Sequence, residues 1–153
     1  MNMEDYTGLE GRRNRNDGAA PGAPQGTGGR RRFVYKKIRL TINEAGRYIT
    51  NAQFVLDKNI RSIEAITLTS DNEEKVFNLT QRLEINGVEL LPQDFEARVI
   101  YAYASVPVAD RYFDLNSEPA GNGVVKITCF DTSPSAGFTA YNVNYYLKCL
   151  LAD

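Results

Sequence analysis

The sequence predicts an all-β sandwich, and three observations support that prediction. From Phe33 onward the chain consists of short runs in which apolar and polar residues alternate, the pattern of half-buried strands. Turn residues separate these runs at roughly regular spacing, and no run has a convincing helical period. About eight short strands of this kind favour two packed sheets, of jelly-roll type.

The first half of the body divides into strands and polar turns. Residues 33–42 alternate cleanly, and we expect further extended segments over 47–57 and 63–69. After a polar turn over 70–74, extended structure is expected to resume over 76–79. The apolar residues of the first strand, predicted to share its inner face, are Val34, Ile38, Leu40 and Ile42.

A tight hairpin over residues 82–90 is the sharpest local prediction. Asn86 and Gly87 stand between two alternating runs. This pair accepts the positive φ values of a type I′ turn, whose twist matches the flanking strands. We expect residues 92–94 to end the hairpin.

The region after the hairpin is less regular. Residues 95–103 fit either a strand or a short helix, and Pro107 argues for an edge or a loop. A short aromatic strand is expected over 111–115. A long mobile loop is then expected over 116–123, because this stretch contains Pro119 and two glycines.

Two closing strands are predicted over residues 124–130 and 138–151. The last one alternates strictly, and a long terminal strand of this kind is expected in the middle of a sheet. Its predicted inner residues are Tyr141, Val143, Tyr145, Leu147, Cys149 and Leu151.

Residues 1–32 have a different composition from the β-domain predicted over 33–153. They hold seven glycines and two prolines, and Leu9 is their only aliphatic side chain larger than alanine. Such a segment cannot bury enough apolar surface to fold alone. We therefore predict a flexible N-terminal arm over 1–32, which becomes ordered only when a neighbour supplies contacts.

Charge is divided unevenly between the arm and the body. The chain has a net charge of −1, whereas the arm has six arginines against four acidic residues. A basic arm suits an acidic partner, either nucleic acid or the acidic face of an adjacent subunit. We favour contact with protein and keep nucleic acid as the alternative. The arginines predicted to bind the partner are Arg12, Arg13, Arg15, Arg30, Arg31 and Arg32.

The chain has nine tyrosines and seven phenylalanines but no tryptophan. On an exposed strand face such rings either stack on bases or fill a subunit interface. The neighbouring strand positions carry Asn and Thr more than Lys and Arg, which disfavours base stacking. The aromatic residues that we predict at an interface are Tyr101, Tyr103, Tyr112 and Tyr146.

Catalysis is not expected, because the sequence contains no histidine. The common general base and the Ser–His and Cys–His nucleophile pairs are therefore missing, as are zinc sites of the usual Cys/His kind. Cys129 and Cys149 are predicted to be small buried apolar residues in a reducing compartment, with a disulfide between them as the lesser alternative. We predict no enzymatic activity, no cofactor and no metal.

Two acidic groups in the sequence are not expected to form functional sites. Asp110 and Asp114, four residues apart on a strand, would lie about 13 Å apart, too far for a glycosidase pair. The acidic turn over 71–74 lacks the spacing of a calcium loop.

Membrane insertion and export are not expected either. The chain has no run of apolar residues long enough for a transmembrane helix and no apolar core of a signal peptide. We therefore expect a soluble product made in the cytoplasm.

The Gly/Arg-rich arm over 11–32, the short-stranded body and the segment over 82–92 together resemble structural proteins of bacteriophage virions. The likeness is to minor capsid, penton, decoration and head-fibre anchor proteins. It implies a non-enzymatic virion component, assembled in the host cytoplasm, that forms homo-oligomers through its β-domain. Its arm would contact neighbouring capsid proteins, with no membrane insertion and no small-molecule substrate.

Two other functions remain open. The chain could bind single-stranded nucleic acid through the arm arginines and the sheet tyrosines. It could also be a glycan-binding module of a fibre that uses tyrosines near the loop over 116–123.

Overall fold

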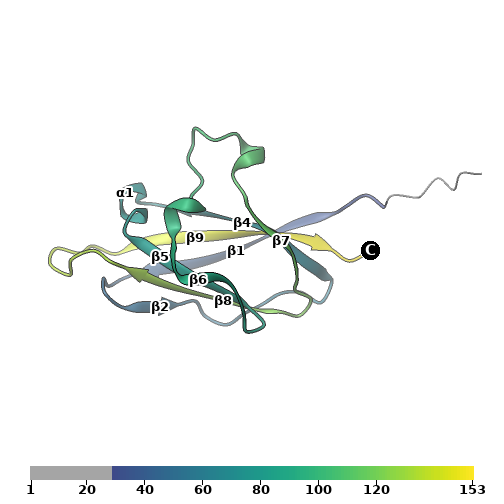
Figure 1. The fold of residues 1–153 in the computed structure, drawn as a ribbon, viewed down its shortest axis with the longest axis horizontal. Coiled ribbons are helices and arrows are strands. Elements are labelled where there is room, and N and C mark those ends of the chain that lie inside the picture. The colour runs from purple at the N-terminus through teal and green to yellow at the C-terminus, as the bar shows by residue number, and fades with distance from the viewer. Residues whose placement is uncertain (1–28) are drawn as a thin grey trace, which may run out of the picture.

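The computed structural model describes residues 29–153, which form nine strands, one helical turn and two short 3₁₀ helices (Figure 1). The strands are β1 (Phe33–Ile42), β2 (Tyr48–Thr50), β3 (Phe54–Val55), β4 (Ile60–Ser70), β5 (Leu79–Ile85), β6 (Val88–Glu96), β7 (Phe113–Pro119), β8 (Val124–Asp131) and β9 (Tyr141–Leu151). The helical elements are α1 (Glu73–Val76), η1 (Ala97–Val99) and η2 (Val108–Asp110).

The strands form two antiparallel sheets that pack against each other, so the predicted all-β sandwich is confirmed. Sheet A has the order β1-β9-β4-β7, and sheet B has the order β2-β8-β5-β6, with β3 also paired to β8. If β2 and β3 are counted as one interrupted strand, each sheet has four strands. Every connection then crosses between the sheets except the β5–β6 hairpin. This order is that of a jelly roll, in which two Greek keys close a double sheet.

Strand β9 lies in the middle of sheet A, as its length and alternation predicted. It pairs with β1 along one side and with β4 along the other. Its inner side chains pack against a core that both sheets supply, including Leu40 of β1, Leu68 of β4 and Ile127 of β8. The buried inner residues of β9 are Tyr141, Val143, Tyr145, Leu147 and Cys149.

Two tyrosine hydroxyls of β9 cross the core to polar groups of sheet B. The Tyr145 hydroxyl donates to Oε1 of Gln81 at 3.2 Å and lies 3.2 Å from Sγ of Cys129. The Tyr141 hydroxyl donates to a carboxylate oxygen of Asp131 at 2.5 Å. These contacts give partners to polar groups that would be costly to bury alone.

The predicted hairpin is confirmed, with φ values of 53° at Asn86 and 77° at Gly87. The expected end at residues 92–94 is wrong, because β6 continues to Glu96. Pro92 is tolerated inside this strand because β6 is an edge strand, where a missing N–H need not break a ladder.

The extended segment predicted over 47–57 is interrupted between β2 and β3. In this gap, the side chain of Asn51 makes the hydrogen bonds to the backbone of β8 that a neighbouring strand would otherwise make. Its Oδ1 accepts from the Ile127 N–H at 2.7 Å, and its Nδ2 donates to the Val125 carbonyl at 3.2 Å.

The extended structure predicted over 76–79 is also wrong, because α1 forms first and β5 begins only at Leu79. Asn72 caps this turn by accepting from the Lys75 N–H, and Val76 is buried beneath it. A local side-chain cap therefore overrides the extended propensity of the segment.

Residues 95–103 end β6 and then turn through η1, and Tyr101 makes a parallel bridge to Leu68. The strand expected over 111–115 begins later and continues into the segment predicted as a loop. Asn116 and Ser117 adopt φ values of 55° and 57°, which form an irregularity between two paired stretches of β4 and β7. The glycan-binding alternative thus loses half of the loop on which it depended, because β7 extends to Pro119.

Both cysteines are buried with free thiols, as predicted for apolar positions. Burial raises the pKa of Cys129 to about 12, and the hydrogen bond between Cys129 and Tyr145 opposes this effect. Burial likewise raises the pKa of Cys149 to about 11 and raises the pKa of Tyr145 well above its ordinary value.

We expect Gly87→Ala to lower the free energy of unfolding by about 1–2 kcal/mol, the cost of a left-handed conformation for an L-residue. A Cβ at Gly87 would meet no atom within 4 Å, so the loss reflects the backbone alone. Urea unfolding measures it. Gly29→Ala is the matched control, since its Cβ would make only an ordinary 3.7 Å contact with Asp153. Equal stability of the two variants would contradict the turn geometry.

Stability should fall as the solution becomes alkaline. The folded pKa of Cys129 lies above its ordinary value of 9.0, so the folded state keeps a proton that the unfolded state loses. The contribution of Cys129 to the free energy of unfolding is intact below pH 9. It is lost as the pH rises towards 12, at about 1.4 kcal/mol per pH unit. Urea unfolding between pH 7 and 11 tests this, and Cys129→Ala should give a shallower slope. If Cys129→Ala leaves the pH dependence of the free energy of unfolding unchanged, the buried thiol is not its cause.

Candidate interaction surface

The outer side of sheet A presents a mixed set of aromatic and basic side chains. The antiparallel register places Lys37 of β1 beside Tyr146 of β9, and Tyr35 of β1 beside Lys148 of β9. Because strand residues alternate between faces, the buried residues of β9 leave these neighbours pointing outward. We call this surface the basic aromatic face, and it consists of Phe33, Tyr35, Lys37, Arg39, Tyr112, Tyr146 and Lys148.

Cations and rings contact each other directly on this face. Nζ of Lys37 lies 5.8 Å from the ring centroid of Tyr146, and Nζ of Lys148 lies 4.5 Å from that of Phe33. Both distances fall within the range of cation–π attraction. Tyr35 nevertheless keeps 57% of its surface exposed, so the face still offers a large ring to a partner.

Tyr112 joins the face from the far edge of sheet A. It directly precedes β7, yet its ring centroid lies 5.8 Å from that of Tyr35 on β1, the opposite edge strand. The contact therefore spans the outside of β9 and β4. Burial raises the pKa of Tyr112, with smaller contributions from Tyr35 and Tyr146.

Among the described residues, the cations of the basic aromatic face form no direct ion pair with a neighbouring carboxylate, although the charge of Arg39 contributes to the lowered pKa of Asp71. Among the ion pairs formed within residues 29–153, none includes Lys37, Arg39 or Lys148. The outward positions of β1 and β9 carry no acidic residue. Asp71 borders the face, where hydrogen bonds from Asn142 lower the pKa of its carboxyl.

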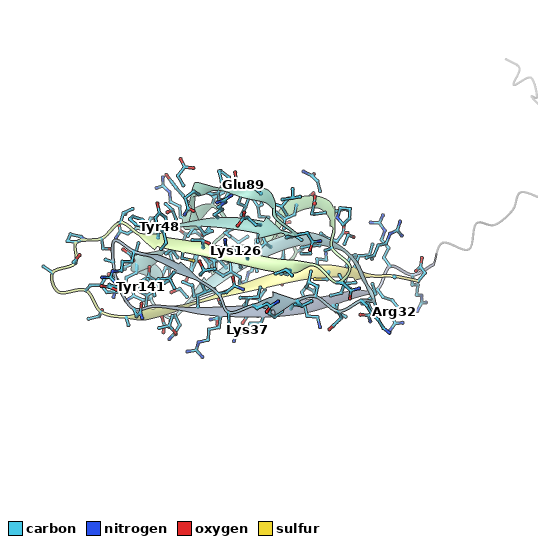
Figure 2. The ribbon with its side chains drawn as sticks, turned by 90° about the horizontal axis from the view of Figure 1, so that it is seen from below. Arg32, Lys37, Tyr48, Glu89, Lys126 and Tyr141 are labelled. Atoms are coloured by element: carbon cyan, nitrogen blue, oxygen red, sulfur yellow. The ribbon has the colours of Figure 1, made fainter. Side chains whose placement is uncertain are left out.

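The outer side of sheet B has a different electrostatic character. Arg82 forms ion pairs with Glu84 at 3.0 Å and with Glu89 at 2.6 Å, and Lys126 lies 3.5 Å from Glu84. Figure 2 shows Glu89 and Lys37 on opposite outer sides of the sandwich. The charges of sheet B thus largely satisfy one another, whereas Lys37, Arg39 and Lys148 on the outer side of sheet A form no ion pair within residues 29–153.

The sheet order adds to one expectation from the sequence. The surroundings of the strand tyrosines were expected to carry Asn and Thr more than Lys and Arg, and Thr41, Asn142 and Asn144 do lie on the outward positions of β1 and β9. The β1 neighbour of Asn144 in the register, however, is Arg39. Residues about a hundred positions apart in the chain become neighbours, which local patterns do not reveal.

The four tyrosines predicted at an interface separate into two pairs. Tyr112 and Tyr146 belong to the basic aromatic face. Tyr101 and Tyr103 pack edge to face, with ring centroids 4.7 Å apart, at the base of the loop that contains η2. All four are partly buried, and their role at an interface remains a prediction.

The loop between η1 and β7 extends beyond the sheets (green, top of Figure 1). The side chain of Arg111 stabilises this loop by hydrogen bonds to its backbone. Its Nε donates to the Val106 carbonyl at 2.7 Å, and its guanidinium also donates to the Ala104 carbonyl at 3.2 Å. The loop is anchored to β4 by backbone hydrogen bonds between Leu68 and the segment 100–102.

The arginines predicted to bind a partner fall in two groups. Arg12, Arg13 and Arg15 lie outside the described residues. Arg30, Arg31 and Arg32 are exposed and directly precede β1 (Arg32 in Figure 2). The Arg32 carbonyl already accepts a hydrogen bond from the Leu151 N–H at 2.9 Å, so the sheet begins to hold the chain at this point.

A shallow polar hollow of about 450 Å³ lies beside this exit point, lined by residues that include Arg31, Arg61 and Glu64. The Glu64 carboxylate accepts hydrogen bonds from the hydroxyls of Ser62 and Ser117. The bond from Ser62 is the main cause that lowers the pKa of Glu64. The carboxylate is therefore satisfied by its own neighbours.

The described part of the chain contains no cluster of three or more His, Cys, Asp or Glu side chains that could hold a metal ion. Asp110 and Asp114 are exposed, and Asp114 accepts from the Asn116 N–H. Over residues 29–153, no helix has the length and apolar character needed to cross a membrane.

Comparisons with protein-family models, curated proteins and solved structures find no match to this chain. The fold and the surface therefore define it by architecture: a jelly-roll sandwich with one outward sheet face that is both basic and aromatic.

We expect Arg111→Ala to loosen the loop between η1 and β7. The substitution removes two hydrogen bonds from a charged donor, each worth about 1–3 kcal/mol. Limited proteolysis should then cut within 104–110 roughly tenfold faster than in the unmodified protein. Arg98→Ala is the matched control, because Arg98 is exposed and its one ion pair within residues 29–153 is with Glu96. Equal cutting rates in both variants would show that Arg111 does not hold the loop.

Proposed function

We propose that this protein is a non-enzymatic structural component of a viral particle, of bacteriophage type. The single observation that supports this most is the jelly-roll strand order, because that double sheet is a recurrent building block of viral capsids. Lectin domains share the architecture, so the fold alone does not choose between the two.

The basic aromatic face supports a role in assembly. Tyrosine and phenylalanine are enriched in the cores of protein interfaces, where their large rings bury area at little entropic cost. Tyr35 and Tyr146 stand on paired strands, so a partner would meet a surface that is already ordered. We propose that the β-domain forms homo-oligomers through such surfaces.

In this proposal the arm over 1–32 anchors the protein to neighbouring capsid subunits. Fixing each residue of a flexible segment costs about 1–2 kcal/mol of backbone entropy. Anchoring therefore requires extensive contacts along the arm, which single arginine–carboxylate pairs would not provide. Arg30, Arg31 and Arg32 mark where the arm joins β1.

A second candidate function is binding of single-stranded nucleic acid, and one observation favours it. Lys37, Arg39 and Lys148 share a face with exposed rings, the combination that stacks bases and attracts phosphates. Oligonucleotide binding that weakens steeply with added salt would support this function. The absence of binding at low salt would dismiss it.

We expect a chain that lacks residues 1–28 to keep its β-sheet circular dichroism but to lose incorporation into particles. The reason is that the deletion leaves both sheets intact and removes the proposed anchor. Immunoblotting of purified particles, produced with the complete or the shortened chain, measures incorporation.

The matched control replaces Arg12, Arg13 and Arg15 by lysine, which keeps their charge. Replacing the same three by glutamine should reduce incorporation more than lysine does. Normal incorporation of the shortened chain would refute the role of the arm.

A further inference from the structure

The first ten residues of the chain have a composition that complements the basic aromatic face. They contain Glu4, Asp5 and Glu10, and no lysine or arginine. All the arginines of the arm follow, from Arg12 onward. The large apolar side chains of this segment are Met1, Met3, Tyr6 and Leu9.

We propose that the basic aromatic face is the docking surface for residues 1–10 of this chain. Three carboxylates would meet the three cations Lys37, Arg39 and Lys148, none of which forms an ion pair within residues 29–153. When such carboxylate–cation pairs lose their water at an interface, they determine which partner binds and in which alignment.

The apolar part of the segment matches the exposed rings. Phe33 and Tyr35 keep 37% and 57% of their surface exposed, so a partner that covers them gains apolar burial. Methionine, tyrosine and leucine side chains suit this contact, because rings attract both sulfur and aromatic groups. A purely acidic peptide would satisfy the cations but not the rings.

The length of the connecting chain permits the contact. Residues 11–32 separate the segment from β1 and could span up to about 75 Å when extended. The ten residues of β1 cover only about 33 Å. The segment can thus reach this face on its own subunit or on a neighbouring copy, and the chain enters at the Phe33 end of the face.

Nucleic acid is a weaker match for the same surface. Three cations would neutralise only about three phosphates, which gives a small electrostatic contribution. Asp71 and Asp114 at the borders of the face would repel phosphates and the carboxylates of residues 1–10 alike, so they do not distinguish the two occupants. The acidic decapeptide matches the number of cations and supplies apolar groups as well.

Zero-length carbodiimide cross-linking of the complete protein tests the proposal, because this reagent joins a carboxylate to a lysine only when they touch. We expect the carboxylates of residues 1–10 to be joined mainly to Lys37 and Lys148. Lys126, on the outer side of sheet B, is the internal control and should give few such links.

Arg39→Glu provides the matched variant, because it keeps both reactive lysines. We expect it to lower the yield of these links on the order of three- to tenfold by turning an attraction into a repulsion. Arg47→Glu should leave the yield unchanged, since Arg47 lies in the turn after β1, where it pairs with Glu44. Equal linking to Lys126 and Lys37, or a yield unaffected by Arg39→Glu, would overturn the proposal.

Mixing isotopically labelled and unlabelled chains then separates this inference from the proposed function. Links between chains of different mass support both the docking and the role of the arm in assembly. Links confined to single chains still support the docking but contradict an arm that anchors the protein to its neighbours. A single-stranded oligonucleotide that protects Lys37 and Lys148, in the absence of arm links, would overturn the docking in favour of nucleic acid.

Discussion

The strict alternation of β9 is the constraint on which the rest of the structure depends. One side of this strand completes the core, and the other side presents Tyr146 and Lys148 outward. A slip of one residue against β1 or β4 would carry Lys148 into the core and expose Leu147, which no compensating contact could offset. The register of sheet A, and with it the composition of the outer face, follows from this single strand.

The buried tyrosines of β9 tie that register to sheet B. Tyr145 reaches Gln81 on β5, and Tyr141 reaches Asp131 on β8. These hydrogen bonds add little net free energy, but an alternative register would take the tyrosine donors away from Oε1 of Gln81 and Oδ2 of Asp131, two buried oxygens. The polar groups in the core thus select one packing of the two sheets.

Local patterns predicted the elements that depend on nearest neighbours. The first strand and the last strand were expected close to their observed bounds, and the Asn86–Gly87 turn was expected at its observed position. The predicted secondary structure is wrong where contacts between distant residues or a single side chain determine the local conformation. Pairing with β4 on both sides of Asn116 and Ser117 makes this segment an irregularity within β7 instead of a loop. The side chain of Asn72 caps the segment after β4 as a helical turn.

The residues of the candidate surface also divide into those that the sequence predicted and those that it did not. Tyr112 and Tyr146 were predicted from composition and alternation, but the cations beside them were not, because β1 and β9 lie about a hundred residues apart in the chain. Only the sheet order reveals that the Lys37 and Tyr146 positions are neighbours. The contrast with sheet B, whose Arg82 and Glu89 pair with each other, also requires the fold.

The jelly-roll body carries the basic aromatic face, for which we propose contact with polypeptide. The most direct test of this proposal is the mass of the complete protein in solution, measured by multi-angle light scattering over a wide range of concentrations. The account predicts a closed homo-oligomer with a mass that is a whole multiple of 17.1 kDa. A single species of 17.1 kDa at every concentration would contradict it.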